Sequence, residues 1–244
     1  MIEVLAWIVA ISLFTVAGAY YARRFESPDA LIAIYVAFVI LSQIMAVKLA
    51  VFDLGIAQLV APAAVLVYSV TYLFTDIVNE RFGRRAVHRM IFICFVAQVA
   101  QVFFLWLATV VAPAPFWTGQ QAWDTIIGFV PRIIVASWIA FLVSENFDAV
   151  VYSWFRKLTR GRHLWARNVF SSLPALSLDT LLFITIAFWG VAPLETLLVG
   201  QLGVKWLVGL VNVPFMYLNK WVMRAPDLLD EAKARKASRV PGHR

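Results

Sequence analysis

The chain has 244 residues, of which 62% are hydrophobic and only 14% are charged, and its formal net charge is +7. Soluble domains contain nearer 45 to 50% apolar and about 25% charged residues, so a soluble domain of this size could not bury so much apolar side chain. The composition therefore excludes an ordinary soluble domain and predicts a membrane protein. The single cysteine, Cys94, can form neither an internal disulfide nor a zinc site by itself.

Seven apolar stretches approach the length of about 20 residues that crosses a bilayer core of about 30 Å. In chain order they are 3–22, 30–52, 56–79, 90–112, 128–152, 169–190 and 203–223. The first is too long for a signal peptide and no basic segment precedes it, so we interpret it as a retained helix. Each stretch is continuous, whereas barrel strands would alternate between polar and apolar residues. The sequence thus predicts an all-α, polytopic integral membrane protein with about seven transmembrane helices.

The basic residues indicate how these helices are oriented. Of the 21 Lys and Arg residues, 18 fall in four clusters, at 23–24, 81–89, 156–167 and 220–244. Because cytoplasmic loops are enriched in Lys and Arg, this spacing places the N-terminus outside and the C-terminus in the cytoplasm. The positive charge then reflects topology in the cytoplasmic membrane, and no nucleic-acid partner is expected. We divide the chain into an N-terminal helix with its turn (1–29), a six-helix core (30–223) and a basic cytoplasmic tail (224–244).

A few ionisable side chains fall inside the predicted helices or at their ends. They are Lys48, Asp76, Arg132, Glu145, Asp148, Asp179 and Lys205. A charge at the bilayer centre costs about 2.5 to 3.5 kcal/mol even on insertion scales, so these residues are expected to face a protein interior, to pair with one another, or both. The three cations lie in the outer thirds of their helices and the acids from the midplane inward. Such an interior predicts a transporter of a small polar molecule.

Several of these charges also have a purely structural explanation that involves no substrate. Lys48 and Asp148 lie close enough to helix ends to extend toward the membrane surface. The cytoplasmic acids could instead pair with Arg81, Arg84 or Arg156. Glu145 and Asp148 are three residues apart and share a helical face, so a proton-coupled step is a further interpretation of that pair.

The polar residues within the spans suit a nucleobase-like ligand. A planar heterocycle with a guanine-like edge presents adjacent N–H donors and a carbonyl, which a carboxylate and an amide or cation can bind. Gln43 and Gln201 supply amides, although joining helices is the ordinary role of such side chains. Neither a metal site nor a cofactor is predicted.

Several motifs resemble the queuosine precursor transporter family, whose members are also described as vitamin uptake transporters. The similar segments are YLFTDIVNERFG at 72–83, PRIIVAS at 131–137, LDTLLF at 178–183 and GQLGVK at 200–205. The resemblance covers about residues 35 to 222. It implies import of a 7-deazapurine precursor of queuosine or archaeosine, chiefly 7-cyano-7-deazaguanine, for tRNA modification. It also implies a distant similarity to the membrane-embedded substrate-binding components of energy-coupling-factor vitamin transporters.

The resemblance assigns substrate binding to Asp76, Arg132, Asp179 and Lys205, and also to Gln201. With Lys48 and Gln43, which the charges and amides of the helices single out, these residues form the predicted substrate-binding set. Departures from the family pattern occur at Ser42-Gln43 and in the segment 174–177, which reads PALS.

The sequence also bears on two other classes of function. An intramembrane enzyme could use Ser171, Ser172 and His163, but no G-x-S-x-G or H-E-x-x-H motif occurs, so no catalytic residue and no enzymatic activity are predicted. A membrane subunit that captures a vitamin or another nucleobase-like molecule would need a separate ATPase, because this sequence contains no P-loop. Self-association into a homo-oligomer also stays open.

Overall fold

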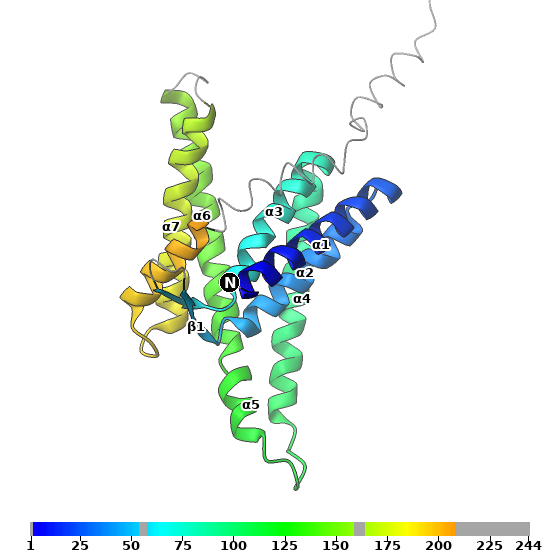
Figure 1. Cartoon of the computed structure of the whole chain (residues 1–244), viewed down its shortest axis with the longest axis vertical. Coiled ribbons are helices and arrows are strands. Elements are labelled where there is room, and N and C mark those ends of the chain that lie inside the picture. The colour runs from blue at the N-terminus through cyan, green and yellow to red at the C-terminus, as the bar shows by residue number, and fades with distance from the viewer. Residues whose placement is uncertain (1, 54–57, 159–163, 208–244) are drawn as a thin grey trace, which may run out of the picture. The chain divides into compact units, whose positions relative to one another are not determined.

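The computed structural model describes residues 2–53, 58–158 and 164–207, and these residues are mostly helical (Figure 1). The helices are α1 (Ile2–Phe25), α2 (Asp29–Met45), α3 (Val65–Phe82), α4 (Arg84–Val110), α5 (Gln120–Ile127), α6 (Val130–Leu158) and α7 (Leu164–Phe188). Residues 194–207 are also helical. Two strands, β1 (Leu49–Asp53) and β2 (Gln58–Pro62), form an antiparallel pair.

Helices are confirmed at the predicted stretches 3–22, 90–112, 128–152 and 169–190, which correspond to α1, α4, α6 and α7. The last predicted stretch, 203–223, is described only as far as residue 207, and the predicted tail lies outside the described residues. The short helix α5 was not predicted. Its eight residues are too few to cross a membrane, and they contain no long apolar run.

The prediction of an all-α fold is wrong between residues 49 and 62. The predicted helix 30–52 ends at Met45, and the predicted helix 56–79 begins only at Val65, because the residues between them form the β1–β2 hairpin. Valine, leucine and phenylalanine in these short segments also suit a strand, and an apolar run of this length does not distinguish the two structures. Pro62 stands at the end of β2, opposite Leu49, where its missing N–H is tolerated.

The described chain divides into two compact units. The first contains residues 2–39 and 67–97, and its buried core joins α1, α2, α3 and the first part of α4. Each of the four helices contributes buried side chains to this core, among them Ile11, Leu31, Phe74 and Met90. Close packing of α1 on α2 depends on Gly18, where a Cβ atom would lie 2.7 Å from a methyl carbon of Leu31.

The second unit contains residues 40–66 and 98–207 and holds the hairpin, α5, α6, α7 and the helical residues 194–207. Its core includes Ala46, Ile133, Ile184, Phe188 and Leu197. Helices α6 and α7 pack against each other along much of their length (Figure 1). Apolar packing therefore brings together segments that are far apart in the sequence.

The helical segment 194–207 lies directly against β2. A Cβ atom on Gly200 would overlap the backbone carbonyl of Val60, and one on Gly203 would come 2.8 Å from the side chain of Leu59. Glycine at both positions lets helix and strand approach closely, as small residues do at helix interfaces within membranes. The hairpin thereby supports the helix that carries Gln201 and Lys205.

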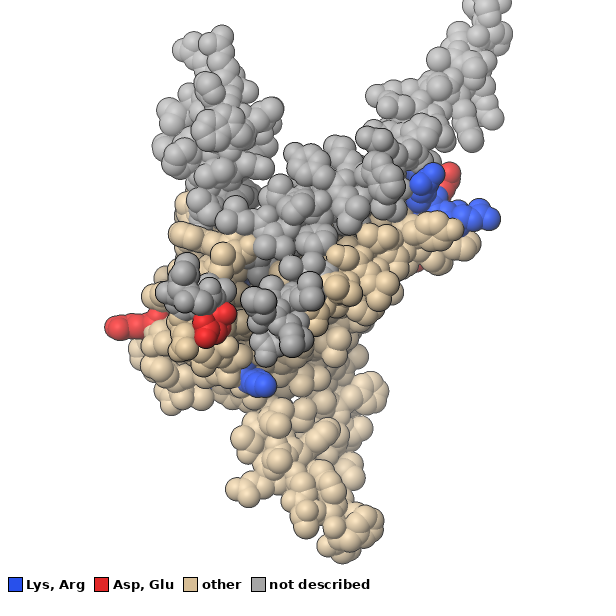
Figure 2. All heavy atoms as spheres, in the orientation of Figure 1, with Lys and Arg blue, Asp and Glu red and all other residues tan. Residues whose placement is uncertain are grey.

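Among the residues that the structure describes, two helical stretches are long and apolar enough to cross a membrane, Arg84–Val110 and Gln120–Ser144. Only 17% and 33% of their most apolar windows are buried in the protein, whereas the core helix of a soluble protein would be mostly buried. In Figure 2 the end of the molecule that contains α5 and the last turns of α4 shows no charged side chain on the face drawn. These exposed apolar surfaces and the composition agree with a membrane protein.

Candidate substrate-binding site

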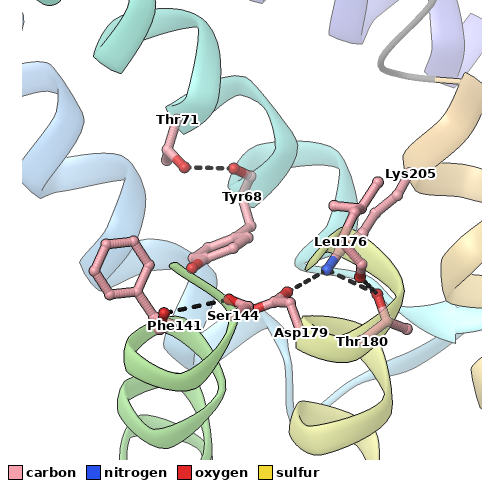
Figure 3. A network of polar contacts seen from close by, with 8 residues as sticks. All are labelled: Tyr68, Thr71, Phe141, Ser144, Leu176, Asp179, Thr180 and Lys205. Carbon is pink, nitrogen blue, oxygen red and sulfur yellow. Dashed lines mark hydrogen bonds and ion pairs between the residues drawn. The ribbon is translucent and has the colours of Figure 1, made fainter. Parts of the chain in front are cut away.

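A buried ion pair lies in the second unit between α7 and the helical residues 194–207. Lys205 Nζ donates to Asp179 Oδ2 over 2.7 Å, and the two side chains are 3% and 8% exposed (Figure 3). No other charged residue whose side chain the structure describes belongs to its buried set. Because a buried charge is tolerated only when it is paired and hydrogen-bonded, each of these residues requires the other.

Thr180 provides a second acceptor for the lysine. Lys205 Nζ lies 3.1 Å from Thr180 Oγ1, and that hydroxyl donates to the carbonyl of Leu176 over 2.9 Å (Figure 3). The hydroxyl therefore uses its proton on the helix backbone and presents a lone pair to the ammonium group. Two of the three lysine N–H donors are occupied in this way, which holds Nζ at a defined position beside α7.

Gln201, on the same helical segment as Lys205, carries an acceptor that no described residue occupies. The residue is buried, and its Oε1 atom forms no hydrogen bond with the described part of the chain. Gln201 is four residues before Lys205, so the two side chains share one helical face, with Cβ atoms about 5 to 6 Å apart. An unsatisfied buried acceptor costs about 1 to 3 kcal/mol, which an N–H donor of a ligand would recover.

A second amide of this unit is also buried. Gln43 on α2 accepts a hydrogen bond of 3.4 Å from Ser137 Oγ on α6. Both residues lie within about one helical turn of the apolar core, since Ala46 lies three residues after Gln43, just past the end of α2, and Ile133 precedes Ser137 on α6. Polar groups from α2 and α6 therefore border the same core as those from α7 and 194–207.

Arg132 has a role at the end of α7. Its Nε atom donates to the carbonyl of Ile186 over 2.9 Å and one terminal nitrogen donates to the carbonyl of Trp189 over 2.7 Å. The guanidinium also lies 5.6 Å from the ring centre of Phe129. A cation placed on the final carbonyls of a helix satisfies orphaned acceptors and complements the helix dipole. In this structure Arg132 is thus a helix-capping residue.

The other predicted site residues are not part of this cluster as described. Lys48 was predicted to lie inside a helix, which is wrong: it is exposed in the turn between α2 and β1, because the hairpin replaces the end of that helix. Asp76 is an exposed residue of α3 in the first unit. Glu145 and Asp148 belong to α6, but their side chains lie outside the described residues. A binding role for Lys48 and Asp76, and a proton-coupled role for Glu145 and Asp148, stay predictions.

Sequence reasoning missed Thr180 and Ser137. Helical hydroxyls often bond to their own helix backbone, as Thr15 does with Ile11. The sequence does not show that Thr180 also accepts from Lys205, or that Ser137 donates to Gln43. The position of Thr180 directly after Asp179 is the sequence signal that could have indicated its place in the site. Among the described residues, no group of three or more His, Cys, Asp or Glu side chains forms a candidate metal site.

Comparison with known proteins places these residues in a family context. The family described as "Putative vitamin uptake transporter" matches residues 62–219, a range that includes Arg132, Asp179, Gln201 and Lys205. Over 159 residues the chain is 30% identical to the "Probable queuosine precursor transporter" of Bacillus subtilis (strain 168), which covers 64% of this chain and 69% of that protein. No solved structure matches.

Proposed function

Because this chain belongs to the family described as "Putative vitamin uptake transporter", we propose that it imports a 7-deazapurine precursor of queuosine or archaeosine, such as 7-cyano-7-deazaguanine, for tRNA modification. The name of the Bacillus subtilis relative supports a queuosine precursor as the substrate. The observation that carries the proposal is the buried polar cluster of the second unit, formed by Asp179, Thr180, Gln201 and Lys205. This set of residues is hereafter called the polar cluster.

Each member of the polar cluster has a role in the proposed binding mode. Gln201 Oε1 accepts an N–H group from the heterocycle, since its acceptor is unoccupied by the described residues. The carboxylate of Asp179 binds the donor edge of the base while the hydrogen bond from Lys205 holds that carboxylate in place. Gln43 supplies an amide from α2. Arg132 acts indirectly, by holding the C-terminal end of the helix that carries Asp179.

The proposed topology follows from the apolar stretches and the basic clusters. We place the protein in the cytoplasmic membrane as a multi-pass chain of about seven helices, with the N-terminus outside. The two candidate spans support this arrangement. The hairpin is accommodated because its backbone groups pair with each other, and because irregular backbone is tolerated in a membrane where protein covers it.

Uptake by whole cells tests the proposed function. Cells unable to make 7-cyano-7-deazaguanine and lacking this gene are supplied with the compound, and queuosine in their tRNA is measured. Restoring the gene is expected to restore the modified base. Equal queuosine with and without the gene would contradict the proposal.

A matched pair of variants tests the binding mode. Gln201→Leu removes the unoccupied acceptor and is expected to reduce uptake by tenfold or more. Gln98→Leu is the control, because Gln98 is an equally buried amide whose Oε1 is already bonded to Trp138 Nε1 at 2.7 Å. Expression of both variants is measured in the membrane fraction. Equal uptake by the two variants would mean that Gln201 does not bind the substrate.

A further inference from the structure

The first unit has one end that is rich in arginine, where α1 ends and α2 and α4 begin. Residues 23–29 and 80–89 together contain six arginines and three acidic residues. Arg89, in the second turn of α4, forms an ion pair of 2.8 Å with Asp29 at the start of α2. Only residues 26–28 separate α2 from α1, so the arginines at the end of α1 lie at this same end of the unit (Figure 2). The fold therefore brings together two basic clusters that are far apart in the sequence.

Five arginines at this end are exposed. They are hereafter called the basic surface and comprise Arg23, Arg24, Arg84, Arg85 and Arg89. Arg84 and Arg85 form no ion pair and no side-chain hydrogen bond with any residue that the structure describes. The first turn of α4 contains no acidic residue, and a cation there opposes the positive end of the helix dipole. An anion from outside the chain would therefore stabilise the basic surface.

Exposed apolar side chains border the basic surface on two helices. On α1, Tyr20 is 62% exposed and lies four residues before Arg24. On α4, Phe92 is 67% exposed and lies three residues after Arg89. Residues three or four apart share one face of a helix, so each helix presents a cation beside an aromatic ring. A phospholipid has the matching arrangement, with a phosphate directly beside acyl chains, whereas a free phosphate ion or a nucleic acid carries no acyl chain.

We propose that the basic surface binds the headgroup of an anionic phospholipid, whose acyl chains lie along the exposed sides of α1 and α4. Clusters of about four to eight basic residues directly beside a membrane-spanning helix attract anionic lipids, and each cation adds to the attraction. Orientation in the membrane requires only that cations are numerous on one side, and it does not require them to form one surface after folding. The folded protein therefore distinguishes a lipid-binding surface from a signal for orientation alone.

Thermal unfolding with added lipid tests the inference. The purified full-length chain in an uncharged detergent is titrated with phosphatidylglycerol or with phosphatidylcholine of identical acyl chains, and circular dichroism follows unfolding. A lipid that binds the folded state raises the melting temperature, and the titration gives its apparent affinity. Phosphatidylglycerol is expected to bind at least fivefold more tightly, which corresponds to about 1 kcal/mol. Glycerol 1-phosphate, which has the phosphate without acyl chains, should leave the melting temperature unchanged at the same concentration.

Three double variants locate the binding surface. Arg84→Gln/Arg85→Gln is expected to reduce the ratio of the two affinities at least threefold. Arg23→Gln/Arg24→Gln removes the part of the basic surface on α1 and should have the same effect, and it decides the question if the first variant does not fold. Lys233→Gln/Lys236→Gln is the matched control, because it lowers the net charge by the same amount within the C-terminal tail. This control should leave the ratio unchanged.

Three outcomes would overturn the inference. A ratio below fivefold in the original protein would leave the arginines to orientation in the membrane or to an acidic protein partner. A ratio that falls equally in the tail variant, or that neither arginine variant lowers, would mean that this surface does not hold the lipid. A shift with glycerol 1-phosphate as large as that with phosphatidylglycerol would assign the surface to a soluble phosphate compound. None of these titrations contains a transported substrate, so their result is independent of the proposed function.

Discussion

Removing one member of the Asp179–Lys205 pair is expected to destabilise the protein far more than removing both. At 2.7 Å the attraction between the charges is about 6 kcal/mol for an effective dielectric constant of about 20, and it offsets the cost of burying them. Asp179→Asn or Lys205→Met leaves the other charge buried and unpaired, so each variant should lose about 3 to 5 kcal/mol of unfolding free energy. The double variant should lose at least about 2 kcal/mol less than either.

Thermal unfolding in one detergent measures this difference. For a chain of this size about 1 kcal/mol corresponds to 2 to 4 °C, so each single variant should melt about 6 to 20 °C lower. Circular dichroism follows the helices. Labelling of Cys94 by a thiol dye gives a second reading, because this cysteine is the only one in the chain and is buried in α4. The double variant should melt close to the original protein.

The exposed pair Arg89–Asp29 provides a control, in which the same two single variants and double variant are compared. Its side chains are 59% and 58% exposed, so the same substitutions there should change stability by less than about 1 kcal/mol, singly or together. Losses in the buried pair that simply add, so that the double variant melts lower by the sum of the two single shifts, would refute the reasoning. Such a result would mean that neither charge depends on the other.

Three further predictions concern packing, capping and topology. Gly200→Ala should lower the melting temperature by several degrees more than Gly203→Ala. The Cβ atom added at Gly200 meets the backbone of β2, whereas the one added at Gly203 meets a side chain that can move. Equal shifts for the two variants would contradict this contact. Arg132→Met should cost about 1 to 3 kcal/mol by thermal unfolding, since it removes two hydrogen bonds to the end of α7, and an unchanged melting temperature would argue against the cap. In a cysteine-free background, Phe116→Cys should react with a membrane-impermeant maleimide added to intact cells, whereas Arg24→Cys should not. Phe116 is 89% exposed and lies between the two candidate spans, on the predicted outer side. Labelling of Arg24→Cys alone would mean that the predicted orientation is reversed.

Helix prediction succeeded where apolar runs are long and failed at the hairpin. The run that becomes α4 is continuous from Met90 to Val110, and no short alternative can hold so many apolar residues. Around Lys48 the sequence is also apolar, yet the strands form because β1 and β2 pair with each other and because β2 supports the helix that contains Gly200. The contact of β2 with that helix joins segments far apart in the sequence, and no local pattern reveals it.

The membrane character, the unusual intramembrane charges and the resemblance to a transporter family are all determined by the sequence itself, because they follow from residue type and spacing. Only the tertiary structure decided which charges meet. Asp179 and Lys205 are 26 residues apart on different helices, and the packing of those helices makes them one buried pair with Thr180 beside it. The same packing assigns Arg132 to the end of α7 and leaves Gln201 with an acceptor that no described residue uses. Burial is the physical reason, since the cost of an unpaired charge or acceptor depends on what surrounds it in three dimensions.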